Sequence, residues 1–278
     1  MRIRAKTRVQ SLYCALLYLI VYLMSLYRNW RMATNEGYWK HYSAYRTRDN
    51  TREVIAATFI KMRKDNINLG SVDSCLALGT GDGQKEVEFI KEFAANIGKL
   101  VAVEPDHQSV EHLKVHLGKS LPGVDSQVCE TDVQSWEGPD DTVHLILMFQ
   151  FIYFLSLSER KELFKKIRDH WLAAEGIVVI ISQDAGTLLR ICEQLGGRPV
   201  LTWEEVEADM LEAGFIKQHA YGMQTVHDLS DPDQSLLRFF EKVVERPLTL
   251  DDICAAIKEV CPEGKSDGVY QLAIFKIQ

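Results

Sequence analysis

The sequence contains no C-x-x-C pair among its six cysteines, which leaves little support for a zinc site or a thioredoxin-like redox site. Its seven prolines and 17 glycines form no extended linker, and no internal repeat is visible. The hydrophobic fraction of 46% and the charged fraction of 26% exclude a disordered or collagen-like chain. For 278 residues we expect one large α/β domain, alone or with additional segments.

The chain also has no excess of basic residues, since its net charge is −7. Residues 1–31 carry six basic side chains and no acid, so the acidic excess lies in the rest of the chain. Nucleic-acid binding requires a basic face, and we therefore expect no nucleic-acid partner. His112 and His116 have a metal-like spacing, but no third ligand is placed to join them, so we predict no metal site.

One long apolar run is present, because residues 9–27 carry no charged side chain and arginines flank them on both sides. As a helix of about 28 Å, this run would match the hydrocarbon core of a bilayer. We predict a single-pass membrane anchor within residues 1–31 and a cytoplasmic catalytic domain at residues 32–278. Two alternatives stay open, because Met32 could start a soluble protein and the run could be a buried core helix.

The remainder alternates short apolar strands with amphipathic helices, which predicts a doubly wound parallel sheet with helices on both faces. A helical cap at 36–66 precedes this alternation. The predicted strands are 74–78, 99–103, 126–129, 143–148, 177–181, 215–219 and 269–277. The predicted helices between them are 84–95, 108–117, 158–171 and 203–213. An insertion at 222–266, with helices at 235–244 and 251–260, separates the last two strands.

A glycine-rich turn, Gly79-Thr80-Gly81-Asp82-Gly83, directly follows the first strand and opens a helix. Glycines there let a ligand approach the backbone closely and expose helix N–H groups to it. Glu104 ends the second strand, where a carboxylate can accept both hydroxyls of a ribose. Together the two features indicate an adenosine-type ligand at the carboxyl ends of the strands. Taken alone, the turn could be only a tight strand–helix connection, and Glu104 only a surface acid.

The spacing of the glycines disfavours a nicotinamide enzyme, because Gln84 stands where the third glycine of G-x-G-x-x-G would fall. Asp132, after the third strand, could accept a hydrogen bond from an adenine amino group. The tail, with a capping box at Thr202 and Glu205 and then two closing strands, resembles the S-adenosylmethionine-dependent class I methyltransferases. In that family the seventh strand inserts antiparallel.

Five segments resemble the histamine N-methyltransferase family in order and spacing over nearly the whole domain from about residue 38. They are LALGTGDGQKEVEF, VAVEPDHQSVEHLK, HLILMFQFIYFL, LTWEEVEADMLEAGF and SDPDQSLLRFF. The resemblance implies S-adenosylmethionine as cofactor and a seven-stranded class I methyltransferase fold. It also implies a monomeric domain that acts on a small-molecule amine.

The resemblance assigns roles to individual residues. The implied cofactor-binding residues are Gly79, Gly81, Glu104, Ser109, Asp132 and Phe149. Gln150 would contact the methyl-accepting amine or imidazole and is the implied catalytic residue. The other implied substrate-binding residues are Tyr38, Tyr42, Arg52, Glu53, Tyr153, Phe154 and Tyr270.

Two departures bear on the substrate. The family's substrate-binding glutamate falls on Arg52, with Glu53 beside it, and the family's C-terminal asparagine falls on Tyr270. We therefore expect an N-methyltransferase for a small amine, with a histamine-like imidazole as the first choice. The alternatives are a methyltransferase for another small amine or for a protein, and a homologue that binds the cofactor without catalysis. A dehydrogenase is a more distant third.

Overall fold

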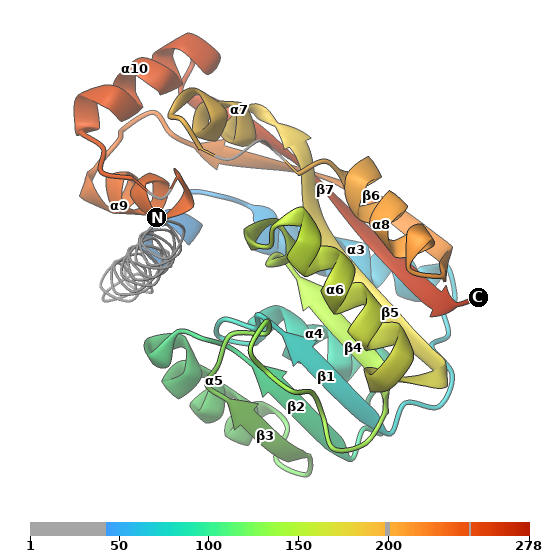
Figure 1. Cartoon of the computed structure of the whole chain (residues 1–278). Helices are drawn as coiled ribbons and strands as arrows, with labels where there is room; N and C mark the ends of the chain where they lie inside the picture. Colours follow the sequence, from blue (N-terminus) through green and yellow to red (C-terminus); the bar gives the residue numbers. More distant parts are fainter. Residues whose placement is uncertain (1–42, 198–200, 245) are drawn as a thin grey trace, which may run out of the picture.

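The computed structural model describes residues 43–197, 201–244 and 246–278, and a seven-stranded mixed sheet forms its centre (Figure 1). Along the sheet the strand order is β3-β2-β1-β4-β5-β7-β6. The strands are β1 (Ser74–Leu78), β2 (Lys99–Val103), β3 (Asp125–Cys129), β4 (Val143–Phe149), β5 (Leu172–Gly186), β6 (Phe215–Asp228) and β7 (Lys265–Ile277). The bounds of β1 and β2 are those that the sequence predicts.

Parallel pairing joins β1 to both β2 and β4, and β7 runs antiparallel between β5 and β6. The expected antiparallel seventh strand is therefore confirmed. The central strands are almost continuously apolar because helices cover both of their faces. The chain turns to opposite faces after β1 and β4, so their carboxyl ends border the crevice where doubly wound sheets bind ligands.

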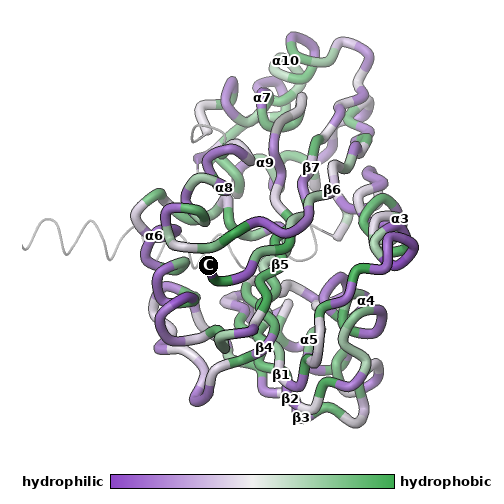
Figure 2. The backbone as a smooth tube through the Cα atoms, turned by 90° about the vertical axis from the view of Figure 1, so that its right-hand side faces the viewer, coloured by the Kyte–Doolittle hydropathy of each residue, from purple (hydrophilic) through white to green (hydrophobic). Residues whose placement is uncertain are grey.

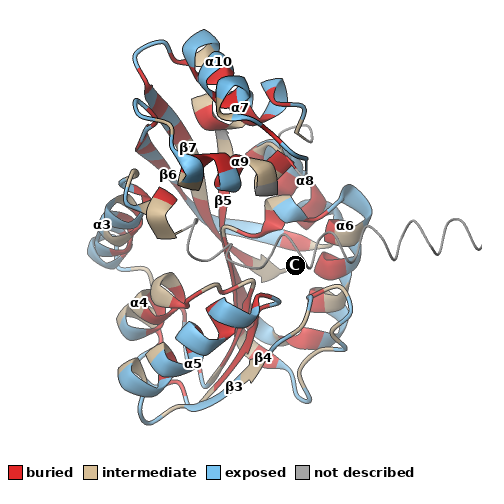
Figure 3. Ribbon diagram, turned by 90° about the vertical axis from the view of Figure 1, so that its left-hand side faces the viewer, coloured by how far each residue is buried: buried red, intermediate tan, exposed pale blue. Residues whose placement is uncertain are grey.

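Helices form one layer on each side of the sheet, with α3, α4 and α5 on one face and α6 and α8 on the other (Figures 1 and 2). Buried residues concentrate in the sheet and on the helix surfaces turned towards it (Figure 3). Each face has its own apolar cluster. The helices are α3 (Thr51–Lys64), α4 (Gln84–Phe93), α5 (His107–Ser120), α6 (Leu157–Lys166) and α8 (Trp203–Glu212).

A third apolar cluster joins three further helices beyond one end of the sheet (Figure 1). They are α7 (Thr187–Gln194), α9 (Gln234–Val244) and α10 (Leu250–Val260). The sequence-based interpretation missed α7, although Leu188, Ile191, Cys192 and Leu195 have the spacing of a helix face and are buried. It also placed 222–266 outside the sheet, whereas β6 continues to Asp228 and β7 already starts at Lys265.

The predicted helix at 158–171 is regular only as α6, which begins at a capping box on Ser156. Its last turn, Ile167–Trp171, is π-helical and leads directly into β5. The predicted cap at 36–66 is interrupted too, because α3 begins only at Thr51.

The described part of the N-terminal cap is fixed to the edge strand β6. The Tyr45 hydroxyl hydrogen-bonds His227 Nδ1 over 2.7 Å, and the Tyr45 ring stacks on Phe239 of α9. Asn50 exchanges two hydrogen bonds with the backbone of Val226. The predicted membrane anchor at 9–27 lies outside the described residues. From residue 43 onward, the helices that the structure describes are all too short or too polar to cross a bilayer.

Candidate functional site

The turn after β1 is built on left-handed glycines. Gly79, Gly81 and Gly83 have φ values of 62°, 55° and 72°. A Cβ on Gly79 would lie 2.5 Å from Cγ of Phe151, so this glycine permits the close approach of the segment that follows β4. A Cβ on Gly81 would have no atom within 4 Å, so that position needs glycine only for its backbone conformation. The turn thus connects β1 to α4 and leaves open space at its middle residue.

Glu104, at the end of β2, is bound to this turn. Its carboxylate accepts the N–H of Gly81 over 2.8 Å and the N–H of Asp106 over 3.0 Å. The side chain is buried, and burial raises the pKa of Glu104 to about 7, although both N–H groups oppose the shift. Each oxygen keeps a free acceptor position, so Glu104 can accept hydroxyl groups from a ligand in addition to the two backbone groups.

Thr80, inside the turn, has a buried hydroxyl that finds no hydrogen-bond partner among the residues described. A buried polar group without a partner is costly, and such groups in a native fold point to an unplaced ligand or water. Asp82, two residues after Thr80, pairs with Arg46 over 3.5 Å and accepts the N–H of Gln84, the first residue of α4, over 3.3 Å. A basic side chain from the N-terminal cap therefore reaches the turn.

Two further predicted cofactor residues lie beside Glu104. Ser109 is buried in the first turn of α5, where its N–H is capped by Asp106 over 2.8 Å. Asp132 is exposed in the loop after β3, and its charge contributes to the raised pKa of Glu104. The structure thus brings the predicted adenosine-binding residues to one edge of the sheet, and their role stays a prediction.

At the end of β4 the backbone turns sharply. Gln150 has a φ of 60°, an unusual value for a residue with a side chain, and such outliers cluster at functional sites. Its N–H donates to the carbonyl of Ile181 over 2.7 Å, which is the last bond between β4 and β5. Lys85 Nζ, from the first turn of α4, donates to Gln150 Oε1. The Phe149 side chain is buried in the core, where its ring packs against aromatic rings of α3 and α4, and is not exposed at the carboxyl ends of the strands.

The predicted aromatic residues are only partly assembled. Tyr153 and Phe154 follow Gln150 in a 3-10 turn, η1 (Ile152–Phe154), with their ring centroids 4.7 Å apart. Tyr270 is buried on β7, directly opposite Gln183 of β5. Tyr38 and Tyr42 lie outside the described residues, so the structure does not place them.

Arg52 and Glu53, at the start of α3, are both exposed. The Arg52 guanidinium forms an ion pair of 2.7 Å with Glu88 of α4, and its side chain remains 52% exposed. The geometry therefore shows no buried acid at this family position.

Glu86, in the first turn of α4, is a second buried carboxyl group that the sequence-based interpretation did not single out. Burial raises its pKa to about 8, so the group is mostly protonated at neutral pH. It lies behind the glycine turn in the protein core. Within the part of the chain that the structure describes, no three His, Cys, Asp or Glu side chains are grouped to hold a metal ion.

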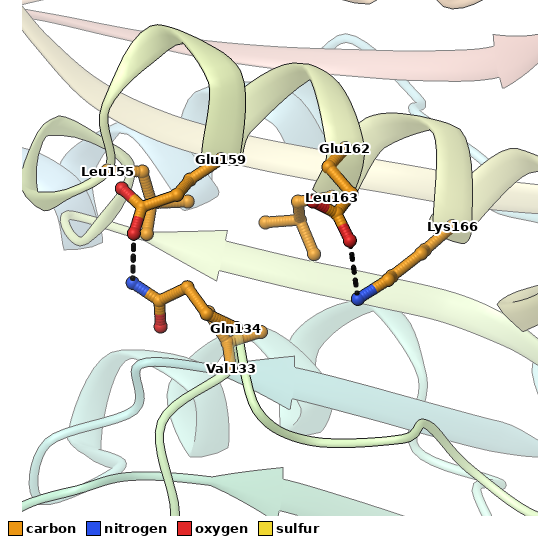
Figure 4. A pocket seen from close by; sticks show the side chains of 7 residues that line it. All are labelled: Val133, Gln134, Leu155, Glu159, Glu162, Leu163 and Lys166. Carbon is orange, nitrogen blue, oxygen red and sulfur yellow. Dashed lines mark hydrogen bonds and ion pairs between the residues drawn. The ribbon is translucent and has the colours of Figure 1, made fainter. Parts of the chain in front are cut away.

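A small cavity adjoins the loop after β3 (Figure 4). It lies between that loop and α6, and its rim includes a hydrogen bond of 3.5 Å from Gln134 to Glu159. Its volume of about 30 Å³ leaves room for only a few water molecules, so it is far too small for a nucleoside. We therefore place the candidate ligand at the strand ends and not in this cavity.

Comparison with solved structures shows the same fold at low sequence identity. A candidate methyltransferase from Bacillus halodurans has a TM-score of 0.55 and 12% identity, over 79% of this chain and 98% of that chain. YcgJ from Bacillus subtilis also has a TM-score of 0.55 and 12% identity, over 80% of this chain and 99% of that one. The cyclopropane synthase MmaA2 from Mycobacterium tuberculosis has a TM-score of 0.54 and 13% identity, over 79% and 84%.

These similarities show that the chain has the class I methyltransferase fold, as its strand order indicates. A sequence identity of 12–13% supports a shared fold and does not establish a shared reaction. No family model matches the sequence, and no curated protein matches it. The likeness to histamine N-methyltransferases therefore rests on the sequence segments alone and stays a prediction.

Proposed function

We propose that the chain is an S-adenosylmethionine-dependent methyltransferase that methylates a nitrogen of a small molecule, with a histamine-like imidazole as the first candidate. One observation carries the proposal most directly. Glu104, the glycine turn and the unpartnered Thr80 hydroxyl meet at the carboxyl end of β1. In doubly wound sheets this is the place of the nucleoside.

The described residues fit this cofactor. Glu104 would accept the two ribose hydroxyls, and Asp132 would accept the adenine amino group from the loop after β3. The Thr80 hydroxyl and the open space at Gly81 lie where the ligand would pass the turn. When bound, the cofactor supplies an electrophilic methyl group on its sulfonium sulfur.

The chain's own residues would position the acceptor and exclude water. Gln150 lies at the strand end next to the turn, and its amide can hydrogen-bond a ring nitrogen once Lys85 releases it. Tyr153 and Phe154 add aromatic surface beside it. An imidazole is largely neutral near pH 7, so its nucleophilic nitrogen needs no strong general base.

Three alternatives remain for the same fold: another small amine as acceptor, a protein acceptor, and cofactor binding without catalysis. Turnover on an amine panel, after cofactor binding is established, separates the last from the others. The membrane anchor at 9–27 and a monomeric domain are further proposals that rest on the sequence.

The test is calorimetric titration of the full-length protein with S-adenosylhomocysteine, compared with Glu104→Gln. We expect saturable binding by the wild type and a loss of at least about tenfold in the variant, because the amide removes one acceptor. Glu111→Gln is the matched control, since Glu111 is an exposed acid on α5 and should bind as the wild type does. Absence of binding by a folded wild-type protein, or binding of NAD in its place, would overturn the cofactor assignment.

A further inference from the structure

Gln183 is a buried side chain that the reaction described above does not use. It is 7% exposed, and its Nε2 has no hydrogen-bond partner among the residues that the structure describes. An amide buried without a partner is unfavourable by an amount that native folds seldom tolerate. Gln183 Nε2 therefore needs a hydrogen-bond acceptor that the described residues do not supply.

The position of Gln183 in the sheet is that of a ligand-facing residue. The last β4–β5 hydrogen bond reaches Ile181, so Gln183 lies two residues, or roughly 7 Å, past the end of β4. β4 has by then turned away at Gln150. Gln183 thus continues β5 beyond the carboxyl end of its neighbouring strand, on the border where the acceptor would lie.

The strand register fixes the face on which Gln183 lies. It pairs with Tyr270, and Tyr270 pairs with Met223, so the three side chains share one face of the sheet. Tyr270 and Met223 belong to the apolar cluster that packs against α3. Thr51, the first residue of α3, has a second buried hydroxyl without a described partner. Unpaired polar atoms therefore occur on the sheet and on the helix that covers this face.

An ammonium group would leave the Gln183 Nε2 donor unpaired, because it offers no acceptor. Charged groups described near the start of α3 are engaged with each other or with the backbone: Arg52 pairs with Glu88, and Asp49 Oδ1 accepts the N–H of Thr51 over 2.8 Å. The amide of Gln183 is neutral, and a neutral amide does not compensate the burial of an ammonium group. The carbonyl oxygen of a neutral amide arm, in contrast, is an acceptor that can take the hydrogen bond of Gln183 Nε2.

We propose that Gln183 is a specificity-determining residue, and that the methyl acceptor is an imidazole whose side arm ends in a neutral amide and not in an ammonium group. The inference rests on the proposed function, since it assumes that the acceptor lies beside Gln150. It distinguishes this chain from an enzyme for free histamine.

The experiment first titrates the full-length protein with S-adenosylhomocysteine and then titrates the saturated complex with histamine or N-acetylhistamine. The two ligands share the imidazole and differ in the charge and hydrogen bonding of the arm. We expect N-acetylhistamine to bind the wild-type complex at least about tenfold more tightly than histamine does. Gln183→Leu should remove that difference, and Gln183→Glu should reverse it by supplying a carboxylate for the ammonium group.

Gln271→Leu is the matched control, because Gln271 lies on β7 opposite Ser182 and therefore on the other face of the sheet. It should keep the wild-type preference. Unchanged affinity for S-adenosylhomocysteine shows that each variant is folded. If the wild-type protein does not bind S-adenosylhomocysteine, the proposed function is refuted. Binding of S-adenosylhomocysteine together with equal or tighter binding of histamine, or with no binding of either imidazole, would overturn the role of Gln183 alone.

Discussion

The raised pKa of Glu104 predicts that cofactor binding depends on pH around neutrality. In the free protein, burial holds this pKa at about 7, against an ordinary value of 4.5. Two ribose hydroxyls that donate to the carboxylate favour its charged form, so binding lowers the pKa. If the pKa returns to its ordinary value, affinity falls by about tenfold from pH 8 to pH 6, because the ionised fraction of the free protein falls from roughly nine-tenths to one-tenth.

Titration of the full-length protein with S-adenosylhomocysteine at pH 6, 7 and 8 measures this directly. At pH 7 we expect the release of about half a proton per ligand, seen as a buffer-dependent binding enthalpy. Glu104→Gln should bind more weakly and without this pH dependence, whereas Glu86→Gln should retain it. An affinity that is constant between pH 6 and pH 8 in the wild type would refute the reasoning, as would an equal slope in Glu104→Gln.

Two further substitutions test the glycine turn and the buried acid behind it. Gly79→Ala should weaken S-adenosylhomocysteine binding by more than about tenfold, because its Cβ would lie 2.5 Å from Phe151. Gly70→Ala is the control, since Gly70 has a similar φ of 76° with nothing within 4 Å and should affect stability only. Glu86→Gln should stabilise the protein at pH 7.5 by up to about 4 kcal/mol, because the folded pKa of about 8 lies above the ordinary 4.5. A carboxyl with a raised pKa contributes its full stability below pH 4.5 and loses it as the pH rises towards 8, so the gain measured by urea unfolding should fall to about 1 kcal/mol at pH 5.

The hydrophobic pattern predicted the central strands well, because a strand that is covered by helices on both faces consists almost entirely of apolar residues. The bounds predicted for β1 and β2 match the structure, and β4 differs by one residue. The second half of β6 escaped prediction for a physical reason. Its inward-facing side chains include Thr225 and His227, which are buried but polar, so hydropathy does not alternate where burial does. The buried residues of α7 have helical spacing in the sequence, so the hydrophobic pattern does predict this helix.

The site was predictable where backbone geometry dictates residue type. A turn that needs left-handed backbone requires glycine, and the acid at the next strand end follows from the order of the strands. Lys85 was not predictable as a site residue, because nothing in its local sequence sets it apart, and the position of Thr80 inside the glycine turn does not reveal that its hydroxyl is buried. Their importance arises from the neighbours that the fold brings to them: Lys85 meets Gln150, the residue after β4, and Thr80 meets no polar partner among the described residues.

The unpartnered polar atoms also divide the site into two functional parts. Thr80 lies with Glu104 at the end of β1, where the nucleoside is proposed, and Gln183 lies past the end of β4, where the acceptor is proposed. A fold that only bound the cofactor would gain nothing from the second buried amide and would lose stability by keeping it. A leucine of similar size at position 183 would extend the apolar cluster of Ile181 at no such cost. If the amide serves only the acceptor, Gln183→Leu should therefore raise the free energy of unfolding and leave the affinity for S-adenosylhomocysteine unchanged, and a loss of stability in urea unfolding would contradict this division of the site.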